Sequence, residues 1–248
     1  TSKNNKQFVL VKSKHIPNIR LFNYFEKNPQ EGHLYIFYSH LLKSIELLLS
    51  QRIVHNDLHF GNMFLNTNTL LPVIIDFGLS LDIKKLFHMP AGNLNYIELR
   101  RKFFVFDPSW WIWPIDYHFI CWFTQKSNFA NTELRLSKND INNIIDIFIT
   151  ENKTLGMFTP KFSKKYKTDA IHYYSKYIDI HRDKVIKDLI LYYKSWDLYT
   201  ISIDFLTIIN TFKEFHKPTV EFVKLLGLAV HPIPSFRPSI KTTMEAFI

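Results

Sequence analysis

The sequence predicts an α+β fold that is mainly helical, and three observations lead to this expectation. Apolar side chains recur at helical spacing over residues 32–51, which predicts a long amphipathic helix. A second helix is expected over residues 137–151, with Ser137 as its N-cap. Short apolar runs such as residues 72–75 predict strands. We therefore expect a few short strands among longer helices.

Two more elements are expected near the start of the chain. Residues 7–12 (Gln-Phe-Val-Leu-Val-Lys) predict a strand. Pro17 and Asn18 then break the chain, and residues 19–25 predict a short helix. At the other end, the apolar run that follows Asp197 predicts a helix surrounded by core.

Composition narrows the class of protein. With 248 residues, of which 46% are hydrophobic, the chain can bury the core of one large domain, with or without a sizeable insertion. The single cysteine, Cys121, excludes an internal disulfide and fits a reducing compartment. The most apolar run, residues 109–123, is interrupted by Pro114, Asp116 and His118, so we expect no membrane span.

The charge balance favours no particular partner. The formal net charge is +9, but the basic residues are scattered, apart from short clusters such as residues 164–167. We interpret this as a generic basic surface and expect no nucleic-acid partner. The histidines show no spacing typical of a zinc site.

The most informative motifs are His-Asn-Asp-Leu-His-Phe-Gly-Asn at residues 55–62 and Ile-Ile-Asp-Phe-Gly at residues 74–78. Transfer of a phosphoryl group needs a carboxylate that orients the attacking hydroxyl, and oxygen ligands that hold Mg²⁺ against the phosphates. Asp57 suits the first role. Asn62 and Asp76 suit the second, because Mg²⁺ prefers carboxylate and amide oxygens.

Together these motifs resemble the catalytic loop and the Asp-Phe-Gly signature of the protein-kinase superfamily. The resemblance implies binding of ATP and Mg²⁺ by Asn62 and Asp76, and a catalytic Asp57. It implies a kinase-like domain over residues 1–248: the end of the small lobe and the hinge at 1–22, and a large C-terminal lobe at 23–248 with a probable insertion around 82–190. The small lobe is largely absent, since no Gly-rich loop or strand lysine can be placed, and a first residue other than Met indicates a piece of a longer chain.

The resemblance also implies structural roles outside the reacting centre. His55 is expected to pack beneath Phe77, which Gly78 follows in the signature. Asp197, at the start of the buried helix, is expected to accept hydrogen bonds from the backbone of the catalytic loop. Asp116 is an alternative for that role, but the residues around Asp197 fit better.

Near the C-terminus, Arg237 stands in an Arg-Pro turn like that of the family. The resemblance implies that it pairs with a carboxylate at the end of the activation segment. Glu98 and Asp183 are both candidates for this partner.

Two positions in the catalytic loop depart from the common pattern. Asn56 replaces an arginine that pairs with a phosphorylated residue in many regulated kinases, so we expect no activation by that route. His59 replaces a lysine that touches the γ-phosphate, and this variant is also similar to haspin-type and small-molecule kinases. His59 either donates to a phosphate oxygen or forms a hydrogen bond that orients Asp57 or Asn62.

The leading functional hypothesis is therefore an ATP- and Mg²⁺-dependent Ser/Thr protein kinase with a protein substrate. The composition and the insertion look like kinases of large DNA viruses, which implies an intracellular location, in the host cytoplasm or the virion, and virion or host proteins as partners. One alternative is a catalytically silent kinase-like scaffold or virion component. Another is a small-molecule phosphotransferase.

Overall fold

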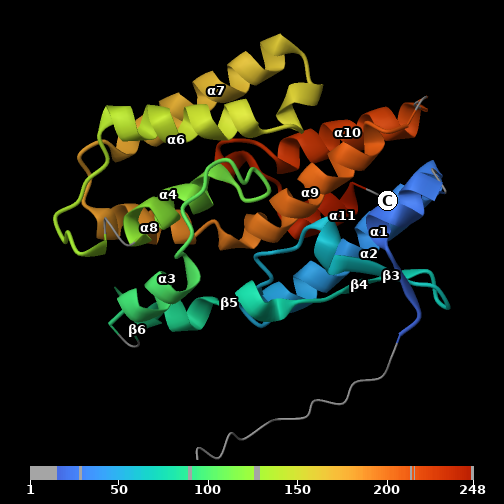
Figure 1. Cartoon of the computed structure of the whole chain (residues 1–248), viewed down its shortest axis with the longest axis horizontal. Coiled ribbons are helices and arrows are strands. Elements are labelled where there is room, and N and C mark those ends of the chain that lie inside the picture. The colour runs from blue at the N-terminus through green and yellow to red at the C-terminus, as the bar shows by residue number, and fades with distance from the viewer. Residues whose placement is uncertain are drawn as a thin grey trace, which may run out of the picture.

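The computed structural model describes residues 16–27, 30–88, 91–125, 129–212, 214 and 216–246. It confirms a mainly helical α+β protein with small sheets (Figure 1). The expected strand at residues 7–12 lies outside the described residues. The described helices are α1 (Leu21–Lys27), α2 (Glu31–Ser50), α3 (Tyr96–Lys102), α4 (Ile115–Thr124), α6 (Lys138–Glu151), α7 (Pro160–Tyr174), α8 (Arg182–Ile190), α9 (Trp196–Ile209), α10 (Lys217–Ala229) and α11 (Ile240–Glu245). The described strands are β1 (Asn18–Arg20), β2 (Ile53–Val54), β3 (Met63–Asn66), β4 (Leu71–Ile74), β5 (Leu81–Asp82), β6 (Phe87–His88) and β7 (Asn93–Leu94).

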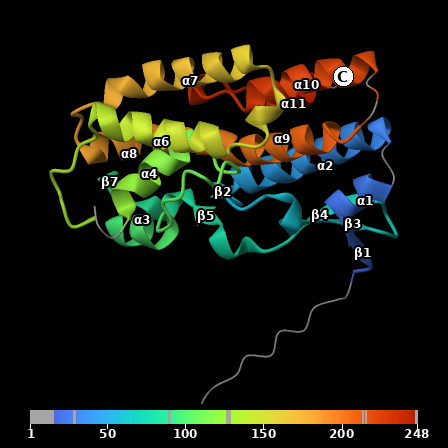
Figure 2. The same ribbon diagram turned by 45° about the horizontal axis from the view of Figure 1, so that its top comes forward.

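The helices lie in layers with the strands at one side (Figure 2). α7 and α10 form one outer row, and α6, α9 and α2 form the next row. The strands, with α1 and α3, lie on the opposite side of that middle row from α7 and α10. α9 contacts both α2 and α10, so it occupies the centre of the molecule.

α9 is the central core helix. Every residue of α9 except Thr207 is buried. A helix that is apolar on nearly all sides is stable only when other elements bury it, and α9 lies in such an environment. The expectation of a core helix after Asp197 is therefore confirmed.

The beginning of the chain differs from the sequence prediction. Residues 19–25 were expected to be helical, but Asn18–Arg20 form β1, and α1 starts only at Leu21. β1 pairs antiparallel with β3, where Ile19 lies opposite Leu65. Pairing with a distant strand therefore overrides the local helical pattern at residues 19–20.

Other expected elements are confirmed. α2 covers almost the whole predicted helix, and its apolar face is buried. α6 begins at Lys138 with Ser137 as N-cap, and Ser137 and Asp140 form a reciprocal capping box. β4 covers most of the strand that the 72–75 run predicts. Within the described ranges, no helix is long and apolar enough to cross a membrane.

The aromatic run at residues 110–119 belongs mainly to the core. Trp113 and Tyr117 are buried, and their rings pack with centroids 4.7 Å apart. Tyr117 also packs edge-on against Trp196 of α9. Cys121 is buried in α4. Trp110 is the exception, because its side chain is exposed.

Candidate active site

The loop at residues 55–62, here the Asp57 loop, follows α2 and β2 and is fixed to α9 by a buried carboxylate. Asp197 accepts hydrogen bonds from the backbone N–H groups of His55 (2.7 Å) and Asn56 (2.8 Å). This is the contact that the resemblance implies for Asp197. Asn56 has a left-handed backbone (φ 67°), which asparagine tolerates better than most residues. The loop therefore turns sharply just before Asp57.

Asp57 and Asn62 are joined within this loop. The Asn62 amide nitrogen donates to both the Asp57 carbonyl (2.8 Å) and Oδ2 of its carboxylate (2.9 Å). Since both partners only accept, the amide must point its NH₂ group at Asp57, and its Oδ1 is left for another ligand. Burial raises the pKa of Asp57 above its usual value, and nearby Asp76 adds to this, although His59, the Asn62 amide and His55 oppose the shift.

His59 lies beside the same carboxylate. Its Nδ1 accepts from the backbone N–H of Gly61 (3.0 Å), which leaves Nε2 to carry the proton in the neutral ring. Nε2 lies 3.6 Å from Asp57 Oδ1. The structure thus places His59 next to Asp57, at a distance too long for the hydrogen bond of the orienting alternative. Gly61 makes room for the imidazole, since a Cβ at this position would lie 2.5 Å from His59 Cε1.

The loop at residues 75–78, here the Asp76 loop, follows β4. Ile75 N–H donates to the Asn62 carbonyl (3.0 Å), so the Asp57 loop enters β3 at the same end of the strand pair where the Asp76 loop leaves β4. Asp76 has a left-handed backbone (φ 60°), and its side chain accepts from Gly78 N–H (3.2 Å). Strained backbone of this kind is frequent at functional sites. The side chain of Asp76 is exposed.

His55 connects the two loops. Its Nδ1 accepts from Asp57 N–H (3.3 Å), so its Nε2 donates to the Ile75 carbonyl (2.9 Å). Its ring packs edge-on against Phe77, with centroids 4.7 Å apart. The expected contact between His55 and Phe77 is therefore present. Phe77 itself remains 49% exposed.

Asn62 and Asp76 offer a donor set that fits Mg²⁺. Asn62 Oδ1 and the Asp76 carboxylate are hard oxygen donors at the ends of neighbouring strands. In the described part of the chain, no group of three or more His, Cys, Asp or Glu side chains gathers as a metal site. Magnesium in phosphoryl-transfer sites commonly takes one or two protein oxygens and completes its shell with phosphate oxygens and water. The residues present fit that kind of site.

Sequence reasoning missed the wall beside the Asp57 loop. Trp113 Nε1 donates to the Asn56 carbonyl (2.6 Å), and the Asn56 amide donates to the Tyr117 hydroxyl (2.9 Å). The exposed Trp110 ring stands perpendicular to the His59 ring, with centroids 5.9 Å apart. The aromatic run was a visible signal, but nothing in it indicated which ring faces the site.

Sequence reasoning also missed Asp204, whose Oδ2 accepts from the backbone N–H of Phe60 in the Asp57 loop (2.6 Å). Asp204 is buried in α9. Its signal in the sequence is an acid seven residues after Asp197 in an otherwise uncharged apolar run.

The expected partners of Arg237 are wrong. Arg237 pairs with Asp116 (Nη2 to Oδ1, 2.7 Å), and both side chains are fully buried. Trp196 Nε1 donates to the other carboxylate oxygen of Asp116 (2.6 Å). Glu98 instead pairs with Arg101 at the surface, and Asp183 accepts from the Tyr96 hydroxyl. A buried guanidinium needs a buried carboxylate that is fully hydrogen-bonded, and Asp116 meets this condition.

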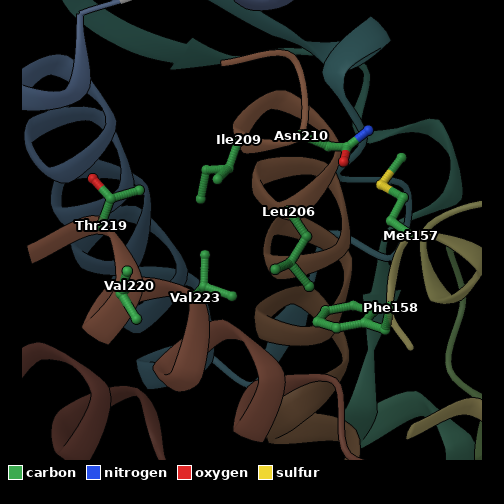
Figure 3. A pocket seen from close by; sticks show the side chains of 8 residues that line it. All are labelled: Met157, Phe158, Leu206, Ile209, Asn210, Thr219, Val220 and Val223. Atoms are coloured by element: carbon green, nitrogen blue, oxygen red, sulfur yellow. The ribbon is translucent and has the colours of Figure 1, made fainter. Parts of the chain in front are cut away.

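Two cavities of the molecule lie away from the Asp57 and Asp76 loops. One, of about 270 Å³, lies between α9, α10 and the turn after α6, and its lining is mainly apolar (Figure 3). A neighbouring cavity of about 500 Å³ lies between α7 and α10. Neither is lined by a residue of the Asp57 or Asp76 loop. The first cavity has few polar groups, whereas Lys165, Asp169, Lys224 and His231 are among the residues that line the second.

Comparison with known proteins identifies no relative, since neither a protein-family model nor a curated protein matches the chain. The residues and geometry of the two loops are therefore what indicate a function for this protein.

Proposed function

We propose that this protein is an ATP- and Mg²⁺-dependent phosphotransferase, and specifically a Ser/Thr protein kinase. The observation that carries the proposal is the convergence of Asp57, Asn62 and Asp76. The Asn62 amide holds the Asp57 carboxylate, and Asp76 follows the strand that pairs with the one after Asn62. In this arrangement Asp57 is available to the substrate hydroxyl, and the side-chain oxygens of Asn62 and Asp76 are available to a cation.

In the proposed reaction, the Asp57 carboxylate orients the Ser or Thr hydroxyl and takes its proton. A bond forms between the hydroxyl oxygen and the γ-phosphorus, and the bond to the β–γ bridging oxygen breaks, so ADP leaves with the electron pair. Asn62 and Asp76 would hold Mg²⁺, which neutralises charge on the phosphates. The raised pKa of Asp57 suits this role, because a base gains proton affinity as its pKa rises.

His59 is proposed to orient Asp57. Its Nε2 lies 3.6 Å from Asp57 Oδ1, and the Asn62 amide donates to Asp57 Oδ2. The hydrogen bond from Asn62 and the neighbouring imidazole together favour one orientation of the carboxylate toward an incoming hydroxyl. We also propose, from composition and resemblance, a viral protein that acts in the host cytoplasm or the virion on virion or host proteins.

The first test measures nucleotide binding by calorimetry, with ATP alone and with ATP plus Mg²⁺. We expect binding that depends on Mg²⁺ and that weakens at least tenfold in Asp76→Asn, which removes the charge and still tolerates a left-handed backbone. Absence of binding in the wild-type protein would contradict the proposal and favour a silent scaffold.

The second test measures phosphoryl transfer to a Ser/Thr peptide library and to a panel of amino alcohols and sugars. We expect peptide phosphorylation that falls about 10²–10⁴-fold in Asp57→Asn, the range for loss of a general base. Unchanged turnover in Asp57→Asn would refute the role of Asp57. Preference for an amino alcohol or a sugar would replace the protein substrate with a small molecule.

A further inference from the structure

α9 carries two acidic residues that both face the Asp57 loop. Asp197 and Asp204 are the only charged residues of this helix. Seven residues correspond to about two helical turns, or roughly 10.5 Å along the axis, so both side chains lie on the same side of α9. Asp197 accepts from the backbone at the start of the loop, and Asp204 accepts from Phe60 N–H further along.

The segment between these two anchors contains the reacting groups of the proposed site. Asp57 and His59 lie between the backbone groups that Asp197 and Asp204 hold. Phe60 also starts the 3₁₀ turn Phe60–Asn62, in which Asn62 N–H donates to the His59 carbonyl (2.8 Å). The position of Phe60 N–H therefore sets where this turn places the Asn62 side chain.

Stability alone does not account for an acid at residue 204. Within the described part of the chain, Phe60 N–H is the only hydrogen-bond donor to Asp204, and no cation pairs with it. Burial raises the pKa of Asp204 well above its ordinary value, and this one hydrogen bond opposes the shift only in part. An apolar side chain would avoid the desolvation cost of a carboxyl group at this core position. What the acid provides is an acceptor aimed at Phe60.

We propose that Asp204 is a positioning residue for phosphoryl transfer: with Asp197 it fixes the Asp57 loop at two points, so that Asn62 reaches both Asp57 and the cation. This inference rests on the proposed function. Asp204 touches neither substrate nor metal, and acts through Phe60 and the 3₁₀ turn. Its loss is expected to impair Mg²⁺ use and turnover more than ATP affinity.

The test compares Asp204→Leu with Asp204→Asn and with a matched control, Thr207→Val. Leucine removes the acceptor at similar volume, whereas asparagine keeps an acceptor oxygen for Phe60 N–H. Thr207 lies on the same helix, and within the described residues its hydroxyl bonds to Ile203 and Thr154 and to no residue of the Asp57 loop. We expect kcat to fall at least tenfold in Asp204→Leu and the Mg²⁺ concentration for half-maximal rate to rise at least threefold. Asp204→Asn and Thr207→Val should stay within about twofold of wild type.

A second readout does not require activity. Hydrogen exchange of the Phe60 amide, followed by NMR, should speed up at least tenfold in Asp204→Leu and remain slow in Asp204→Asn. Unchanged Phe60 exchange, or wild-type kcat and Mg²⁺ dependence in a folded Asp204→Leu, would overturn the inference. If Asp204→Leu does not fold, Asp204→Asn decides, because a tenfold loss of kcat in that folded variant would contradict positioning through the acceptor. If the wild-type protein transfers no phosphoryl group, the proposed function fails, while the exchange data still report whether Asp204 anchors the turn.

Discussion

The Asp57 loop and the Asp76 loop lie side by side, but the protein holds them very differently. The Asp57 loop is anchored to α9 by Asp197 and Asp204, and Trp113 bonds to it from the opposite wall. The Asp76 loop has exposed side chains throughout residues 75–78. Folding of the large helical body therefore fixes Asp57 and Asn62, which we propose as the base and one metal ligand, while Asp76, the proposed second ligand, stands on a more open segment.

This difference suggests that the two loops serve different parts of the proposed function. Asp57 and Asn62, which we propose orient the acceptor hydroxyl and bind the cation, are held by the fold itself. Asp76 depends on its own turn, in which Gly78 N–H bonds to its carboxylate, and on the contacts that His55 makes with Ile75 and Phe77. Substitutions in the two loops should therefore separate effects on stability from effects on ligand binding.

The largest effect on stability is expected from Asp197→Ala. This change leaves the N–H groups of His55 and Asn56 buried without their acceptor, at a cost of about 1–3 kcal/mol for each group. Urea unfolding measures the loss, and Asp197→Asn is the control, because it keeps one acceptor oxygen and should lose less. A loss below 1 kcal/mol in Asp197→Ala would mean that the Asp57 loop is not anchored as described.

The next effect is a dependence of the free energy of unfolding on pH, which arises from His118 near the Asp57 loop. His118 is buried in α4 and bonds to the Trp110 carbonyl (3.1 Å), and burial lowers its pKa from 6.5 to about 4. Between these values the unfolded chain binds a proton that the folded protein does not. The free energy of unfolding should therefore rise with pH from about 4 to about 6.5, with a contribution approaching 1.4 kcal/mol per pH unit.

Unfolding measurements over this pH range test the contribution of His118 by comparison with His118→Gln, which cannot take up a proton there but retains an amide donor for the Trp110 carbonyl. The variant should show a shallower pH dependence than the wild-type protein. Equal slopes for the two proteins would show that His118 is not held neutral in the folded state.

Much of this organisation follows from sequence, and the reasons differ by element. Periodicity was sufficient for α2, α6 and α9, because each has a long run with a defined apolar pattern or cap. It failed at residues 19–20, since β1 forms through pairing with the distant β3. Local pattern carries no information on such a pairing.

In the candidate site, too, local pattern gave no information on contacts between distant residues. The two short motifs were enough to nominate Asp57, Asn62 and Asp76, because the proposed chemistry depends on residue type and local spacing. The Arg237–Asp116 pair joins residues 121 positions apart, and the contact between Asp204 and Phe60 spans 144 positions. These partners are set by helix packing, so a single sequence could nominate Arg237 but could not select its carboxylate.

A smaller effect is expected from Gly61→Ala. Its matched control is Gly78→Ala in the Asp76 loop. A Cβ at residue 61 would lie 2.5 Å from the His59 ring, whereas one at residue 78 would lie 3.1 Å from Asp76 Oδ1. The imidazole must therefore move away from Asp57, which should lower kcat by about 3–10-fold, as expected for the loss of one modest polar contact. Stability should change by less than about 1 kcal/mol because the ring can turn toward solvent.

Kinetics and NMR of the His59 ring distinguish the outcomes for Gly61→Ala. A displaced ring with unchanged kcat would remove His59 from the orienting role. An undisplaced ring would show that the loop backbone yields instead, which would weaken the description of the Asp57 loop as the firmly held one.

The smallest effect on stability is expected from Asp76→Asn. Asparagine tolerates the left-handed backbone at this position and still offers an oxygen to Gly78 N–H, and the side chain is exposed. The free energy of unfolding should therefore change by no more than about 0.5 kcal/mol in urea, without nucleotide or Mg²⁺. A loss above 2 kcal/mol would contradict the difference between the two loops, because the Asp76 loop would then be as much a part of the folded framework as the Asp57 loop. Near-equal stability together with lost Mg²⁺-dependent ATP binding would support that difference, since Asp76 would then serve the ligand alone.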